Sequence, residues 1–212
     1  MTIRDTAPNR LIVEGLDDMH SIISLTKRHG WNWDKPQAHV PYIQNAKGVE
    51  PALAAIAVTV RSYNRVGIVL DADLSLASRW DAVRNQLKEF DFDFPTTPTS
   101  EGTILQSAQK HVGIWLMPNN QSVGKLEDFL AALIPPDDKT WPWAKESTAA
   151  ARAEHAADFT ENDEIKAQIH TWLAWQANPG NPFGTALTAN VFAHDATVAA
   201  AFVAWMTRLF KE

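Results

Sequence analysis

The sequence contains no cysteine. This absence excludes disulfide bonds, a cysteine nucleophile and zinc sites built from thiolates. A metal site in this chain would have to use carboxylates or histidines. Carboxylate oxygens are hard ligands, and they favour Mg²⁺ or Mn²⁺.

Long apolar runs are also missing. No stretch approaches the roughly 20 apolar residues that are needed to cross a bilayer. The first residues do not show a basic region followed by an apolar segment and a cleavage site, which is the pattern of a secretory signal. We therefore expect a cytoplasmic protein with no membrane partner.

Positive charge is in short supply, because 19 lysines and arginines face 25 acidic residues and give a formal net charge of −6. Proteins that coat nucleic acid need the opposite balance, since non-specific affinity depends on neutralising phosphates. The charge does not exclude a nuclease. Divalent ions in an active site bring their own local positive charge to a phosphodiester substrate.

The 212 residues, 45% of them hydrophobic, can bury a substantial core and suit a main domain with a small appendage. Hydrophobic patterns predict an α/β fold with a mainly parallel central sheet flanked by helices. Predicted strands cover residues 10–15, 40–44, 66–70, 103–107 and 111–117, with the last two as a hairpin. Predicted helices cover residues 17–29, 49–63, 75–90, 147–159, 164–176 and 196–210, and a further helix begins near residue 126.

We place the main domain at residues 9–135 and a C-terminal helical extension, packed on it, at residues 136–212. Six apolar side chains lie at helical spacing in the extension, and we assign them a packing role: Ile169, Trp172, Leu173, Phe202, Trp205 and Leu209. An oligomer interface is the alternative, since nine tryptophans are many for this length. The oligomeric state stays open.

The central run is Val66 to Leu70, a near-continuous apolar series that indicates a strand buried on both faces. Asp71 and Asp73 close this run. On an extended backbone, residues two apart point to the same side. The two acids would then emerge at the carboxyl edge of the sheet, where ligands usually bind in α/β folds. The next predicted helix carries Arg79 off its apolar stripe, where a solvated surface position is expected.

Two other segments deliver acids after apolar strands, namely Glu14 with Asp18 and Glu127 with Asp128. Carboxylates grouped in this way repel one another, which raises their pKa values unless cations neutralise the group. Two divalent metals about 4 Å apart would provide that charge and are a general means of cutting phosphodiesters.

Each acid also has an ordinary structural interpretation. Asp71 and Asp73 could form a turn. Asp17 could cap a helix or occupy its first turn, and Glu127 and Asp128 could be first-turn acids favoured by the helix dipole. Local sequence alone leaves both interpretations open.

Three stretches together resemble a known family: residues 11–18 (LIVEGLDD), residues 68–73 (IVLDAD) and residues 113–120 (GIWLMPNN) with the Leu-Glu-Asp that begins at Leu126. They are similar to the TOPRIM domain, shared by topoisomerases, bacterial primases and nucleases of the overcoming-lysogenisation-defect (OLD) type. Within that superfamily, the chain most resembles a small stand-alone bacterial TOPRIM-related group of unknown function. The resemblance covers residues 9–135 and implies a TOPRIM-like Rossmannoid fold.

The resemblance implies that Glu14 is a metal ligand or general acid/base and that Asp71 and Asp73 form an Asp-x-Asp metal pair. These three residues are the catalytic candidates. The implied metal ligands are Glu14, Asp18, Asp71, Asp73 and Glu127. Three further positions are secondary candidates: Asp17, Asp128 and Lys125.

The chain departs from the OLD-type pattern in two places. No residue can be matched to the lysine that those nucleases use near the transition state, and Asn119 stands where relatives more often carry Asp. The OLD-type enzymes also carry a fused ATPase. Here Gly124-Lys125 does not complete a phosphate-binding loop, because Asn119 stands where the first glycine would be needed.

We therefore expect a Mg²⁺- or Mn²⁺-dependent phosphodiester-cleaving (nuclease-like) or phosphoryl-transfer protein. DNA or RNA would be its substrate, and a separate ATPase could be its partner. The alternative is a catalytically silent TOPRIM-like module that binds nucleic acid, a nucleotide or a protein.

Overall fold

The computed structural model describes residues 7–35 and 37–212 and is an α/β fold built on one five-stranded sheet. The strand order is β2-β1-β3-β5-β4, in which β4 runs antiparallel to β5 and the other neighbours are parallel. The strands are β1 (Asn9–Val13), β2 (Tyr42–Asn45), β3 (Arg65–Asp71), β4 (Thr103–Gln106) and β5 (His111–Met117). The predicted mainly parallel sheet and its terminal hairpin are confirmed.

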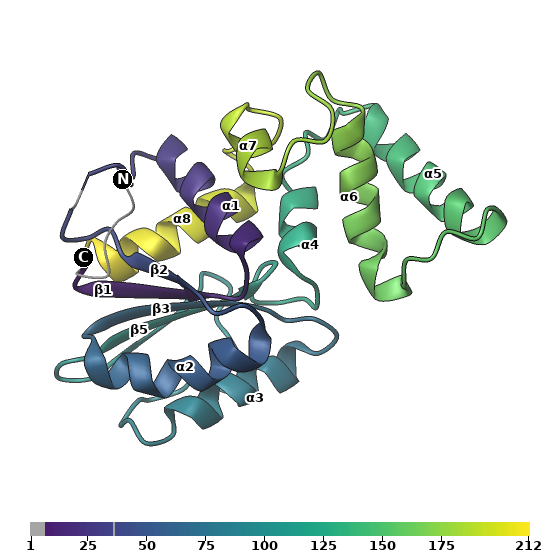
Figure 1. Cartoon of the computed structure of the whole chain (residues 1–212). Helices are drawn as coiled ribbons and strands as arrows, with labels where there is room; N and C mark the ends of the chain where they lie inside the picture. The colour runs from purple at the N-terminus through teal and green to yellow at the C-terminus, as the bar shows by residue number, and fades with distance from the viewer. Residues whose placement is uncertain (1–6, 36) are drawn as a thin grey trace.

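Helices cover both faces of the sheet. Figure 1 shows α2 and α3 on one face and α1 and α8 on the other, while α5 and α6 stand beyond one end of the sheet. The helices are α1 (Leu16–Arg28), α2 (Val49–Ser62), α3 (Leu76–Leu87), α4 (Leu126–Ala131), α5 (Thr140–Glu154), α6 (Glu164–Ala174), α7 (Phe183–Thr188) and α8 (Thr197–Phe210), with a 3₁₀ turn η1 (Glu161–Asp163) before α6.

The sheet divides the interior into two hydrophobic cores, because successive strand residues point to opposite faces. On β3, Ile68 and Leu70 pack into the core formed with α2 and α3, whereas Val69 belongs to the core formed with α1 and α8. All three side chains are fully buried. The central strand is therefore apolar on both sides, as the near-continuous run predicts.

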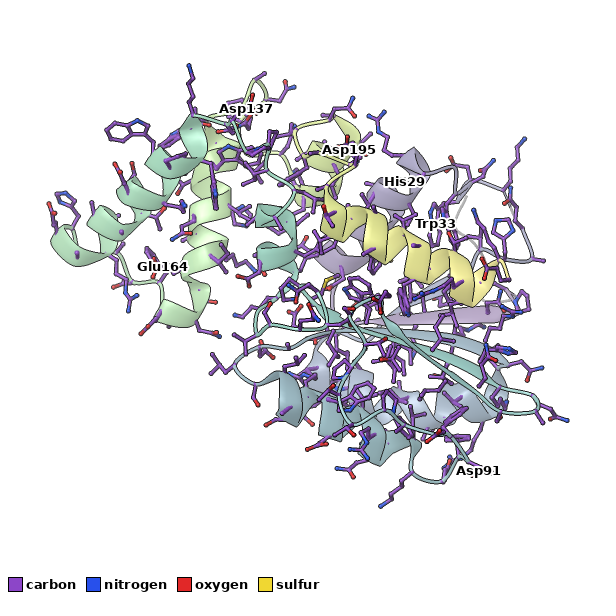
Figure 2. The ribbon with its side chains drawn as sticks, turned by 180° about the vertical axis from the view of Figure 1, so that it is seen from behind. His29, Trp33, Asp91, Asp137, Glu164 and Asp195 are labelled. Atoms are coloured by element: carbon purple, nitrogen blue, oxygen red, sulfur yellow. The ribbon has the colours of Figure 1, made fainter. Side chains whose placement is uncertain are left out.

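Helix α8 lies unusually close to the sheet. A Cβ atom on Gly113 would lie 2.5 Å from Leu209 Cδ2 and 3.0 Å from Trp205 Cζ2, so only glycine leaves room for the helix. Figure 2 shows this helix from behind, lying along the sheet. The six apolar residues assigned a packing role are buried, which confirms that assignment. The last helix of the chain thus completes the core that β3 and β5 begin.

The predicted and observed helices differ most at α5. This helix begins at Thr140, well before residue 147, and the Trp-Pro-Trp segment that starts at Trp141 forms its first turns. Proline is tolerated near a helix start because the amide groups there have no partner within the helix. The short helix α7 was not predicted. Its glycine, Gly184, packs against the backbone of His20 in α1.

Across residues 7–35 and 37–212, the structure contains no helix with the length and apolar character to cross a bilayer.

Candidate functional site

Acids from two neighbouring strands meet at the carboxyl end of the sheet. Glu14 follows β1, and its Oε1 atom accepts a hydrogen bond of 2.8 Å from the backbone amide of Asp71 at the end of β3. Asp71 Oδ1 in turn accepts 2.9 Å from the amide of Leu126, the first residue of α4. Because β1 and β3 are parallel neighbours, their ends share one edge. The carboxyl groups of Glu14 and Asp71 thereby link the end of β1, the end of β3 and the start of α4.

Asp18 lies in the first turn of α1 and is only 7% exposed. Its Oδ2 atom accepts a hydrogen bond of 3.0 Å from the amide of Gly15, the residue that precedes the helix. Its other oxygen, Oδ1, is buried without a hydrogen-bond partner. Burying a carboxylate oxygen without a partner is costly, so this atom marks a position where a ligand would lower the free energy.

Burial and mutual repulsion raise the pKa values of these acids. Burial is the largest cause for Asp71, whose pKa rises to about 9, and the charges of Asp18, Glu14 and Glu127 add to it. Burial, followed by the charge of Glu14, raises the pKa of Asp18 to about 7. Burial also raises the pKa of Glu14, against the lowering effect of its bond to the Asp71 amide. These repulsions show that the acids lie within electrostatic range of one another.

Asp73 has a different environment. Strand β3 ends at Asp71, and Asp73 has a positive φ of 51°, so the prediction that an extended backbone carries both acids to one side is wrong in its geometry. Its backbone exchanges hydrogen bonds of 2.8 and 2.9 Å with Gly124. Its Oδ2 atom accepts 2.6 Å from Arg79 Nη2. Asp73 therefore forms an ion pair with Arg79.

Arg79 is a site residue that the sequence reasoning missed. Its side chain is only 12% exposed, although its position off the apolar stripe of α3 predicts a solvated surface residue. Besides its pair with Asp73, it donates 2.7 Å from Nε to the carbonyl of Asp71. Its spacing of six residues from Asp73, across a loop and one helical turn, is the only signal in the sequence that could have indicated this pair.

The acids at the start of α4 divide into two roles. Asp128 Oδ2 accepts 2.8 Å from the amide of Lys125 and so caps the helix, as its structural interpretation predicts. Glu127 is 7% exposed and faces a cation, with its Oε1 atom 3.4 Å from Lys166 Nζ. Asp17 is exposed in the first turn of α1, where the helix dipole favours an acid.

Two residues that the family resemblance singled out are engaged in local structure. Lys125 Nζ donates 3.0 Å to the carbonyl of Asn162 in η1, which holds the start of α6 beside the site. Asn119 Oδ1 accepts hydrogen bonds from the amides of Gln121 and Ser122, so it closes the turn after β5. These bonds do not involve the carboxyl groups of Glu14 or Asp71.

The acids suit a hard divalent cation in their chemistry but are not arranged around a single point. Within residues 7–35 and 37–212, no three histidines, aspartates or glutamates are placed to hold a metal ion. The reason lies in their hydrogen bonds, because Glu14, Asp18 and Asp71 are each turned toward a backbone amide. A cation would have to use the other oxygen of each carboxyl group, and the groups would have to turn toward a common point to share it.

A hollow of about 540 Å³ lies beside Asp73 and Asp128, and its lining does not include Glu14, Asp18, Asp71 or Glu127. It lies between the loop after β3, which supplies Asp73 and Leu74, and the start of α6, with Lys125 between them. Leu74 is 80% exposed in this wall.

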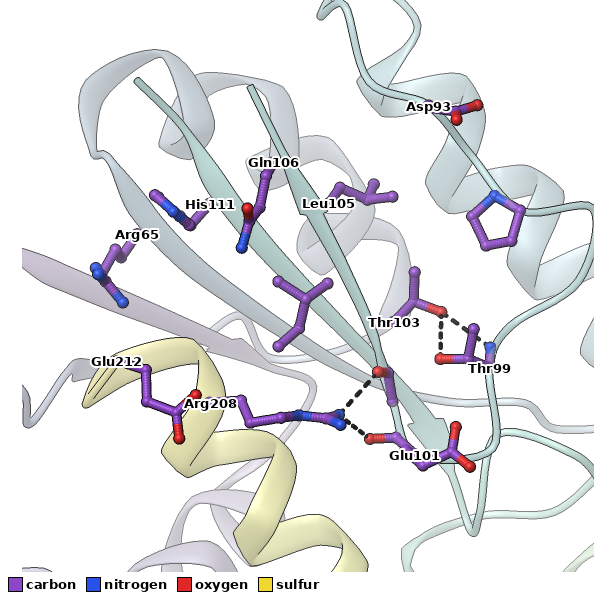
Figure 3. A pocket seen from close by; sticks show the side chains of 13 residues that line it. Arg65, Asp93, Thr99, Glu101, Thr103, Leu105, Gln106, His111, Arg208 and Glu212 are labelled. Atoms are coloured by element: carbon purple, nitrogen blue, oxygen red, sulfur yellow. Dashed lines mark hydrogen bonds between the residues drawn. The ribbon is translucent and has the colours of Figure 1, made fainter. Parts of the chain in front are cut away.

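A second hollow of about 530 Å³ runs along β4 and contains none of the predicted site residues (Figure 3). Its arginines are used in structure: Arg65 donates to the carbonyl of Leu209, and Arg208 donates to the carbonyl of Glu101. We therefore place the candidate site at the acids and not in this hollow.

No curated protein and no solved structure matches the chain. A family model described as "Protein of unknown function (DUF3226)" matches residues 8–211. The match includes both the sheet and helices α5 to α8. The chain therefore belongs to the DUF3226 family, a family of proteins of unknown function.

Proposed function

We propose that this protein is a Mg²⁺- or Mn²⁺-dependent enzyme that cleaves or transfers phosphodiester groups, with DNA or RNA as its substrate. One observation carries the proposal. Glu14 and Asp18 lie on either side of the start of α1, Asp71 ends β3, and the three acids lie within electrostatic range of one another and form no ion pair among the described residues.

Structure alone gives little reason for this arrangement. Caps and turns need one acid each, whereas three neighbouring buried acids raise one another's pKa values and cost free energy on ionisation. A divalent cation removes that cost. Asp18 Oδ1, which is buried and without a hydrogen-bond partner, supplies an oxygen ligand that needs no bond to be broken first.

In the proposed enzyme, Glu14, Asp18 and Asp71 hold the cation. When bound, the cation would polarise a phosphate oxygen and lower the pKa of a water molecule. The chain contributes the positioning, since the Leu126 amide orients the Asp71 carboxyl group. Burial raises the pKa of Glu14, and a raised pKa favours a carboxyl group as a general acid or base.

We also propose that the sheet is TOPRIM-like. An acid follows each of β1, β3 and the loop after β5, in the order that the resemblance requires. The likeness to OLD-type nucleases further suggests a separate ATPase as partner, because residues 7–35 and 37–212 fold into one sheet with its helices and include no phosphate-binding loop.

The test is cleavage by the purified chain of labelled single- and double-stranded DNA and RNA, with Mn²⁺ or Mg²⁺. We expect Asp71→Asn to lower the rate by about 10³-fold or more, as loss of a group that orients reacting atoms does. Asp17→Asn is the matched control, because Asp17 is an exposed acid in the first turn of α1, next to the buried Asp18. Absence of both Mn²⁺ binding and cleavage in the unaltered protein would refute the proposal.

A second candidate is a catalytically silent module that binds nucleic acid, a nucleotide or a protein. It is favoured by the carboxyl groups that face backbone amides and by Asn119, which is engaged in its turn. This module would bind its ligand equally well with Asp71→Asn and would cleave nothing. Cleavage that disappears with Asp71→Asn would rule it out.

A further inference from the structure

Strand β4 lies at the edge of the sheet, with β5 as its one neighbour among the described strands. At the base of the hairpin that joins them, the amide of Ser107 donates 2.9 Å to the carbonyl of Lys110. Because hydrogen-bonded pairs alternate along an antiparallel ladder, Leu105 also bonds to β5. Ile104 and Gln106 therefore direct their backbone amides and carbonyls away from the sheet.

Within residues 7–35 and 37–212, no hydrogen bond outside the ladder engages the backbone of Ile104 or Gln106. The preceding outward residue, Gly102, is different. Its carbonyl accepts 3.3 Å from Arg208 Nη2, and its amide donates 3.0 Å to the carbonyl of Thr99. The open part of the β4 edge is therefore confined to Ile104 and Gln106.

The hollow of about 530 Å³ leaves this edge accessible (Figure 3). Helix α8 bounds it on one side, and the loop that carries Asp93 and Pro95 bounds it on the other. Natural sheets protect such edges with proline or charged residues, and β4, with the sequence Thr-Ile-Leu-Gln, has neither. The opposite edge strand, β2, directly follows Pro41, which has no amide to donate. The β4 edge can therefore accept another strand.

We propose that this edge pairs with the same edge of a second copy of the chain, in antiparallel orientation about a two-fold axis. With Leu105 of both copies on the axis, Ile104 of each copy lies opposite Gln106 of the other. Each such pair exchanges two hydrogen bonds, so the register uses all the open groups of both strands. One sheet then continues through both copies. This inference does not depend on the proposed function, because the acids of the candidate site lie elsewhere.

The charges that line the hollow favour a second copy as the occupant. Glu101 and Arg208 lie beside the start of β4, where Arg208 donates to the carbonyl of Glu101. Arg65 is level with Gln106 at the other end, and Glu212 follows the end of α8 to which Arg65 bonds. A two-fold axis exchanges the two ends. The arginine at each end of one copy then faces an acid of the other copy, which makes the surface complementary to itself.

Sedimentation velocity of the full chain over a range of concentrations tests the proposal, and we expect an equilibrium between monomer and dimer. Gln106→Pro removes the outward amide and leaves the ladder to β5 intact, since proline is tolerated on an edge strand. It should weaken the dimer by about 30-fold, because the lost hydrogen bond occurs twice. Gln106→Ala is the matched control, since it keeps the amide and should dimerise like the unaltered chain. Circular dichroism would verify that both variants fold.

Amide hydrogen exchange, measured by nuclear magnetic resonance on the unaltered protein, tests the same contact without a substitution. The amides of Ile104 and Gln106 should exchange rapidly in dilute protein and more slowly as the concentration rises, whereas the amide of Leu105 should be protected throughout. Exchange at Ile104 and Gln106 that does not change with concentration would overturn the proposal.

A chain that stays monomeric at high concentration would also overturn it, and the edge would then be left to a strand of another protein. A dimer that Gln106→Pro weakens no more than Gln106→Ala does would show that the two copies meet at a different surface, and the proposal would fail.

Discussion

The two ends of the sheet use charged side chains in opposite ways. At the amino end of β3, Arg65 donates to the carbonyl of Leu209 near the end of α8, and Lys110 donates 3.1 Å to the carbonyl of Tyr63. At the carboxyl end, Glu14 and Asp71 accept from backbone amides. Both ends therefore satisfy backbone groups with titratable side chains.

The two ends of the sheet differ in how many side chains of the same charge lie close together. Arg65 and Lys110 satisfy separate carbonyls, and a positive charge near the end of α8 is favoured by the helix dipole. The carboxyl end concentrates several acids in a buried place, and burial with mutual repulsion raises the pKa of Asp71 to about 9. The hydrogen bonds at the amino end are explained by the stability that they add. At the carboxyl end, ionisation of the buried acids would lower the stability of the folded protein.

The largest expected effect is a rise in melting temperature on addition of Mn²⁺, which should depend on the acids at the carboxyl end and not on Arg65 at the amino end. Mn²⁺ at 100 times its dissociation constant should stabilise the protein by about 2.7 kcal/mol, because it binds only the folded state. For a chain of this length, the melting temperature should rise by about 5–10 °C. Thermal unfolding with and without Mn²⁺ measures the shift. Asp71→Asn should abolish it, and Arg65→Met should leave it unchanged.

The next effect is a gain of stability in Asp71→Asn without metal. Between about pH 4 and pH 9 the folded protein keeps the Asp71 proton that the unfolded chain releases, so the contribution of Asp71 to stability is most favourable below pH 4 and falls as the pH rises toward 9. Asparagine retains the acceptor for the Leu126 amide and removes this loss. We expect a gain of about 2 kcal/mol at pH 8, since relaxation reduces the full penalty.

Urea unfolding at pH 4 and pH 8 would measure that gain, which should nearly vanish at pH 4. Asp18→Asn should show the same behaviour over a narrower range, because the pKa of Asp18 rises only to about 7. Equal stability of Asp71→Asn and the unaltered protein at both pH values would remove the contrast between the two ends of the sheet.

At the other end of the sheet, Arg65→Met should cost about 1 kcal/mol. The substitution keeps the apolar part of the side chain and loses the hydrogen bond to the Leu209 carbonyl. The loss should be somewhat smaller at pH 5 than at pH 8, because burial and the charge of Arg65 lower the pKa of His111, and removal of that charge relieves the repulsion of the protonated imidazole. Urea unfolding at the two pH values measures it. A strongly pH-dependent loss would show that this end also depends on coupled ionisation.

The smallest effect concerns an acid at the carboxyl end that lies outside the cluster. Asp17→Asn should cost about 0.5 kcal/mol at pH 7, because it removes a favourable charge from the first turn of α1. This change in stability has the opposite sign to the one expected for Asp71→Asn, although both substitutions remove one carboxyl group from the same end of the molecule. Finding the same sign for both would mean that total charge, and not burial, controls stability there.

Much of the fold follows from local patterns. The buried strand from Val66 to Leu70 could be recognised because an apolar run without alternation fits a strand covered on both faces. The convergence of Glu14 and Asp71 could be expected for the same reason, since parallel strands end at one edge. Asp73 was assigned the wrong geometry because a left-handed residue leaves no trace in a pattern of apolar and polar positions.

The sequence by itself determined the strands, most of the helices and the edge at which the acids gather, because these depend on periodicity and chain direction. Only the tertiary structure decided which acids form ion pairs with arginine or lysine side chains. Arg79 reaches Asp73 across a turn of the chain, and Lys166 reaches Glu127 from a helix nearly forty residues later. Such pairs depend on where whole helices pack, and packing is set by contacts between residues far apart in the chain.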